Sequence, residues 1–283
     1  MWQLPLPEKS VFLVSCLAYL TAAIVGIVQL SATRRAWSRA LVPLVCVGVC
    51  LEMVVLVFRA VAIKAVPLTG LFESMMLLTM VLALIYVVLS VPIQQIWFGS
   101  IMAWLLAVLS ILSAAVAQPA TTAAEEASTP WAIFHASAMV LSSALIMFST
   151  GIAALYLFSQ RQLKHKKVMT VLGRMPNLQW LAKANARSLK LCFVSQTIGL
   201  FCGIGLVILQ AVPQNASLSD WMVDPKILLI AVAWILLLVV MVGRGVHWLS
   251  DKGTAYATLA IFFLVLFASV GVVLFWETRH AFV

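Results

Sequence analysis

Long apolar segments separated by short polar ones run through the whole chain. A run of about 18 or more apolar residues is long enough to cross the hydrocarbon core of a membrane as a helix. The chain has eight such runs, which predict an all-α, polytopic bundle of eight transmembrane helices. Their approximate bounds are 11–30, 40–62, 71–93, 96–117, 131–158, 191–212, 225–246 and 254–276.

The composition supports this interpretation. Hydrophobic residues make up 64% of the 283 residues and charged residues 10%, whereas soluble domains are about 45–50% apolar and about 25% charged. We therefore expect one membrane domain over residues 1–283. The net charge of +9 is typical of loops that face the cytoplasm, so it does not indicate nucleic-acid binding.

The distribution of charge predicts the orientation of the helices. The loops 31–39, 159–190 and 244–253 are rich in Lys and Arg, whereas 118–130 and 213–224 contain acidic residues and no basic ones. Because basic loops stay in the cytoplasm, we expect a multi-pass protein of the inner (plasma) membrane with both termini outside. The basic loop 159–190 also has apolar residues at roughly helical spacing. An amphipathic helix on anionic headgroups and a solvated connector both fit this pattern.

Charged residues inside the spans are few, which argues against coupled ion transport. Arg59 lies near the outer end of the second span, and Glu73 begins the third after a turn that contains Pro67. We expect an ion pair between Arg59 and Glu73 that fixes this hairpin. Glu52 has no evident partner in the sequence. Lys64 is also basic although it falls on the outer side, which the positive-inside rule does not explain.

Two histidines are candidates for metal binding. The predicted topology places His135, near the start of the fifth span, and His280, beyond the eighth, at the same outer face. A pair of neutral imidazoles can ligate heme iron, although each one alone also fits a histidine at the level of the headgroups. The five cysteines form no CxxC motif, so neither a thiol redox site nor a c-type heme attachment site is predicted.

The segment before the seventh span has a clear local interpretation. Asp224 is a good N-cap, and Pro225 suits the first helical position. Lys226 at a helix N-terminus is electrostatically unfavourable, so headgroups or an anionic ligand must compensate it. Trp221 could stack on a flat macrocycle or belong to the interfacial aromatic belt.

The order of several motifs resembles the CcsA/CcmC/HemX-type cytochrome c assembly proteins, a family with a tryptophan-rich "WWD" segment. In chain order they are Arg59 with Pro67-Leu-Thr-Gly-Leu-Phe-Glu73-Ser74, Trp131-Ala-Ile-Phe-His135, Leu172-Gly-Arg-Met-Pro176-Asn-Leu178, Thr197-Ile-Gly199, Asp224-Pro-Lys226 with Trp234 and Arg244, and His280.

The resemblance implies a heme-binding or heme-delivering membrane component of c-type cytochrome biogenesis. His135 and His280 would then be axial ligands of heme b, and Trp221 with Asp224–Lys226 would form the rest of the platform. Arg59, Pro67, Glu73, Trp234 and Arg244 would be structural. The implied partners are a CcsB/ResB-type membrane protein and apocytochrome c. The chain has no catalytic motif of its own, and membership of a heme-attachment (cytochrome c synthase) complex stays open.

A second interpretation stays open beside the first. Only Trp221 precedes Asp224, where the family has several tryptophans, and Val242 stands where a heme-conducting member has a histidine within the membrane. These differences favour the HemX-like branch of the family. A member of that branch would be a regulatory or scaffolding membrane protein without bound heme. It would act on heme-biosynthesis enzymes through the loop 159–190.

Overall fold

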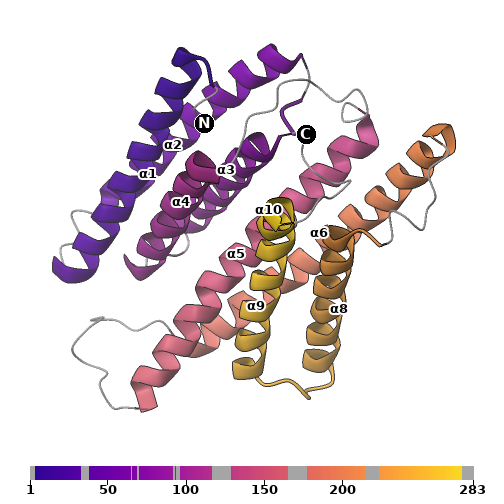
Figure 1. Ribbon diagram of the computed structural model, residues 1–283. Coiled ribbons are helices and arrows are strands. Elements are labelled where there is room, and N and C mark those ends of the chain that lie inside the picture. The colour runs from indigo at the N-terminus through magenta and orange to yellow at the C-terminus, as the bar shows by residue number, and fades with distance from the viewer. Residues whose placement is uncertain are drawn as a thin grey trace. The chain divides into compact units, whose positions relative to one another are not determined.

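The prediction of an all-α protein with eight membrane spans is confirmed. The computed structural model (Figure 1) describes residues 4–32, 38–64, 66–68, 70–91, 93, 96–116, 129–164, 177–214 and 223–275. These residues form helices and short connections and contain no strand. Eight of the helices are long and apolar enough to cross a membrane, by length and composition.

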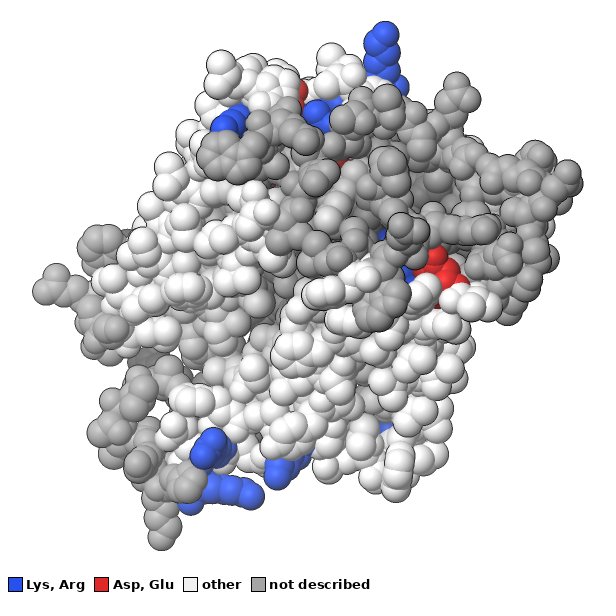
Figure 2. Space-filling model, viewed as in Figure 1, with Lys and Arg blue, Asp and Glu red and all other residues white. Residues whose placement is uncertain are grey.

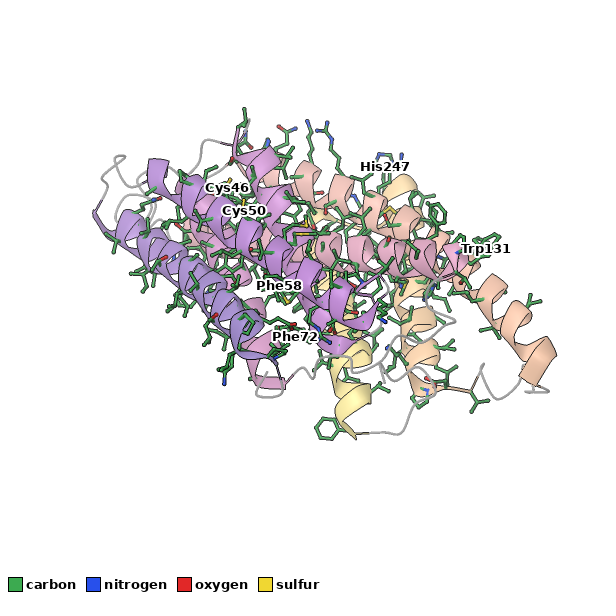
Figure 3. All side chains as sticks on the ribbon, turned by 90° about the horizontal axis from the view of Figure 1, so that it is seen from above. Cys46, Cys50, Phe58, Phe72, Trp131 and His247 are labelled. Carbon is green, nitrogen blue, oxygen red and sulfur yellow. The ribbon has the colours of Figure 1, made fainter. Side chains whose placement is uncertain are left out.

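The described residues cluster into two compact units, of which the first contains the N-terminal four helices. They are α1 (Leu6–Ala32), α2 (Ser38–Ile63), α3 (Leu71–Ser90) and α4 (Ile96–Val116). Helix α1 packs against α2 and α4, and α3 packs against the same two helices. The interior is apolar: Phe12 of α1 meets Phe72 of α3 edge to face at 5.0 Å between ring centroids. Figure 3 labels Phe72 together with Phe58 of α2. Phe58, by contrast, is 41% exposed.

Close contacts between the helices of this unit depend on small residues. A Cβ atom at Gly48 of α2 would lie 2.6 Å from Cε1 of Tyr19 on α1, so the tyrosine ring occupies the space that a larger residue would fill. Ser100 of α4 donates its hydroxyl to the carbonyl oxygen of Gly26 of α1 at 2.8 Å. Small residues let membrane helices approach closely and form hydrogen bonds between their backbones and side chains.

The second unit contains the remaining helices. They are α5 (Pro130–Lys164), α6 (Leu178–Gln214), α8 (Pro225–Gly245), α9 (Asp251–Leu266), the π-helical turn η3 (Phe267–Gly271) and α10 (Val272–Phe275). The helices α5 and α6 lie side by side in opposite directions and make the largest contact (Figure 1). Helix α9 packs on both α5 and α8.

The helices α5 and α6 are longer than their apolar runs. Residues 159–164 and 178–190, predicted to belong to a loop, are helical. At 35 residues α5 is about 52 Å long, well beyond a hydrocarbon core of about 30 Å. The extra turns pack inward, because Ser159, Leu181 and Leu189 are fully buried. Lys and Arg gather on the surface where α5 ends and α6 begins (Figure 2).

A tight turn joins α8 to α9. His247 has a positive φ of 58°, and the backbone N–H groups of Val246 and Leu249 donate to carbonyl oxygens near the end of α8. Arg244 spans the turn, since its Nη1 donates to Oδ1 of Asp251 at 2.9 Å and to Oγ1 of Thr254 at 3.0 Å. The turn therefore holds α8 and α9 as an antiparallel pair.

Candidate functional site

The imidazole of His135 has a defined tautomer. His135 lies in the second turn of α5, and its Nδ1 is 2.7 Å from the carbonyl oxygen of Gly199 on α6. A carbonyl oxygen can only accept a hydrogen bond, so Nδ1 carries the hydrogen. In the neutral ring Nε2 then holds the free lone pair, and no described residue hydrogen-bonds to it. An outer hydrogen bond of this kind is also what orients histidines that ligate metals in other proteins.

Glycines on α6 make room for this ring. A Cβ atom at Gly203 would lie 2.8 Å from Cε1 and 3.0 Å from Nδ1 of His135, so the imidazole rests directly on the α6 backbone. One turn away, a Cβ at Gly199 would lie 2.7 Å from the sulfur of Met139. The Gly199-xxx-Gly203 spacing is the small-residue pattern that allows close packing of membrane helices. The backbone approach is what brings the Gly199 carbonyl within reach of His135.

The N-terminus of α8 lies near His135. Asp224 is the N-cap of α8 and accepts the backbone N–H of Lys226 at 2.9 Å, with Pro225 in the first turn. The ammonium of Lys226 is close enough to His135 to act on it electrostatically. The end of α8 thus brings a cation within electrostatic reach of an imidazole, a combination that favours an anionic group.

Polar contacts tie α8 to α6 further along the helix. Nε1 of Trp234 donates to Oγ1 of Thr197 at 2.8 Å, and its ring stacks on Phe193 at 5.6 Å between centroids. Gln196 is 2% exposed and donates its Nε2 to the carbonyl oxygen of Ile230 at 3.2 Å. These bonds fix how far along α6 the start of α8 lies, and therefore the position of Lys226.

The predicted site residues are only partly gathered at one place. The structure places His135, Asp224, Pro225 and Lys226 in the same unit, with Lys226 near the imidazole. Arg244 lies at the other end of α8, at the turn to α9. Trp221 and His280 lie outside the described residues.

The predicted ion pair of Arg59 with Glu73 is present in the first unit. Nε of Arg59 is 2.7 Å from Oε1 of Glu73, and Nη1 is 3.5 Å from Oε2 of Glu8. All three side chains are buried. Glu8, in the first turn of α1, was not anticipated as a partner. Pro67 lies in the partly buried turn between α2 and α3.

Glu52 does have a partner, although the sequence shows none. The hydroxyl of Tyr19 donates to Oε2 of Glu52 at 2.8 Å, across the interface of α1 and α2. Glu52 is 1% exposed. Its carboxyl group therefore takes part in a buried interhelical hydrogen bond.

The described residues contain no cluster of three or more His, Cys, Asp or Glu side chains that could hold a metal ion. A ligand that brings its own macrocycle needs only one or two imidazoles from the protein. The imidazole of His135 has one ring nitrogen left after its hydrogen bond to Gly199.

Comparison with known proteins identifies the family. The family model described as Cytochrome C assembly protein matches residues 68–280, which is more than half of the chain. The chain belongs to the cytochrome c assembly protein family. No curated protein matches it.

Membership of the cytochrome c assembly family assigns the chain a role in c-type cytochrome biogenesis. The matched segment begins just before α3 and includes α4 and the helices of the second unit, so α1 and α2 precede it. His135, Gly199, Gly203 and Lys226 all lie within it. The two glycines were missed as site residues, although their spacing of four on an apolar helix was a signal for close packing.

Proposed function

We propose that this cytochrome c assembly protein binds heme b through Nε2 of His135 and presents it for c-type cytochrome maturation. The observation that carries the proposal is the hydrogen bond from Nδ1 of His135 to the Gly199 carbonyl at 2.7 Å. This bond leaves Nε2 with the lone pair and restricts rotation of the ring. A fixed, neutral imidazole is the ligand that heme iron requires.

The end of α8 contributes the anion-binding part of this proposed site. Lys226 supplies positive charge near His135, and the Asp224 cap fixes the first turn of α8. A heme propionate is an anionic group of suitable chemistry for this position. In this proposal Trp221 would supply a stacking surface for the macrocycle and His280 a second imidazole for the iron.

When bound, heme supplies the iron centre and the macrocycle to be transferred, and the chain supplies its ligand and orientation. The predicted topology puts this site on the outer side of the inner membrane, with the basic ends of α5 and α6 in the cytoplasm. We propose a CcsB/ResB-type membrane protein and apocytochrome c as the partners that use the site.

An absorption spectrum of the protein purified in detergent tests the proposal. The wild type should show a Soret band and an alpha band of low-spin heme, either as purified or after addition of heme. His135→Ala and His280→Ala should each lose the low-spin spectrum, because each removes one imidazole.

The matched control is His247→Asn, which removes an exposed imidazole in the α8–α9 turn. Asparagine tolerates the positive φ at this position. The control should keep the wild-type spectrum. A wild type that is colourless and does not bind added heme would contradict heme binding and favour the HemX-like scaffolding role.

A further inference from the structure

An apolar groove lies within the first unit. It is an open cavity of about 250 Å³ between α2, α3 and the turn that joins them. The lining comes from both helices and from the turn. It consists of Met53, Leu56, Val57 and Ala60 of α2, Val66, Pro67 and Leu68 of the turn, and Leu77 and Met80 of α3. All residues that line the groove are apolar. In a membrane protein such a surface accepts hydrocarbon and excludes polar ligands.

The lining of the groove limits what it can hold. The groove is open and its walls are apolar, so an occupant has to present hydrocarbon, as the acyl chain of a lipid does.

A lysine lies in the turn that contributes to the lining of this groove. Lys64 falls in the chain between Ala60 and Val66, both of which line the cavity. Lys64 is exposed and makes no hydrogen bond or ion pair within the described part of the chain. The nearby Arg59 is engaged with Glu73 and Glu8 in the interior. Lys64 is thus free to bind an anionic group beside the groove.

We propose that the groove and Lys64 form a binding site for one anionic phospholipid. An acyl chain lies in the groove, and the phosphate of the headgroup pairs with the Lys64 ammonium. This explains a basic residue at a position where the positive-inside rule expects none. The groove lies in the first unit and His135 in the second, so the proposal does not rest on heme binding.

Native mass spectrometry of the full chain in detergent tests this site with two short-chain lipids. Phosphatidylglycerol should bind about fivefold more tightly than phosphatidylcholine, as expected for one lysine near a headgroup. Lys64→Gln should reduce phosphatidylglycerol binding to the level of phosphatidylcholine. Ala60→Phe, which fills the groove, should weaken the binding of both lipids.

Val61→Phe is the matched control for the groove, because Val61 is the next residue, is 72% exposed and does not line the cavity. It should bind both lipids as the wild type does. Equal binding by Ala60→Phe and Val61→Phe, or unchanged lipid preference in Lys64→Gln, would overturn the proposal. If Ala60→Phe abolished a dimer and left lipid binding unchanged, the groove would be a contact between two copies of the chain. That result would also overturn the lipid proposal.

Discussion

The imidazole of His135 on α5 donates from Nδ1 to the carbonyl oxygen of Gly199 on α6, at 2.7 Å. The bond joins the two longest helices that the structure describes and determines which ring nitrogen keeps its lone pair. It exists because Gly203 lets the ring lie against the α6 backbone. A contact that looks like ordinary helix packing therefore also prepares the candidate site.

The first prediction concerns the glycine under the imidazole. Gly203→Ala should weaken heme retention at least tenfold, because its Cβ would lie 2.8 Å from Cε1 of His135 and displace the ring. Gly205→Ala is the matched control, since the nearest atom to its Cβ would be 3.9 Å away in Trp131. Heme titration of both variants in detergent measures the difference. Equal affinities would contradict the role of Gly203 in seating the ring.

The second prediction concerns the buried ion pair of the first unit. Arg59→Met should lower the free energy of unfolding by about 3–5 kcal/mol, because it leaves the buried carboxylates of Glu73 and Glu8 without a cation. Arg244→Met removes a more exposed pair with Asp251 and should cost about 0–1 kcal/mol. Unfolding by denaturant in mixed micelles compares the two. Equal losses of unfolding free energy in the two variants would show that burial of an ion pair does not determine its contribution to stability.

The third prediction concerns the hydrogen bond between Tyr19 and Glu52. Tyr19→Phe should destabilise the protein by about 1–3 kcal/mol, because it leaves the buried carboxyl of Glu52 without its donor. Adding Glu52→Leu to this variant should recover part of the loss, since both polar groups are then gone. The same unfolding experiment measures both variants. A double variant less stable than Tyr19→Phe alone would be inconsistent with this account.

The fourth prediction concerns the link between α8 and α6. Trp234→Phe should keep the stacking on Phe193 and lose the hydrogen bond to Thr197, at a cost of about 1 kcal/mol. Trp248→Phe serves as its control, because Trp248 is 76% exposed. Thermal unfolding in detergent should separate the variants by a few degrees. An equal shift of the unfolding temperature in both variants would contradict a stabilising role of the hydrogen bond between Trp234 and Thr197.

Helices and nearby ion pairs could be predicted from the sequence because their causes are local. A long apolar run has to form a helix in a membrane, since its backbone groups find no water there. Arg59 and Glu73 could be paired because a short turn brings their helices together. For residues 159–190 the sequence left a helix open, but it did not show that the helices α5 and α6 continue into this segment. The predicted spans were ended where charged residues begin, although Lys and Arg are good helix formers.

Contacts between distant segments could not be predicted in the same way. The partner of Glu52 is Tyr19 on another helix, and that of His135 is a backbone carbonyl on α6. Which face of α5 meets α6 depends on packing over the whole length of both helices. The resemblance of the motifs indicated His135 and Lys226 as site residues. The tautomer of the imidazole and the role of Gly203 became visible only in the structure.

The most direct test of heme ligation by His135 is a heme titration of the wild type and His135→Ala, each with and without added imidazole. The wild type should bind with a low-spin spectrum, and His135→Ala should lose this spectrum. Free imidazole should restore it in His135→Ala, because the small ligand can replace the missing side chain against Gly203. A low-spin spectrum in His135→Ala without imidazole would contradict ligation by His135.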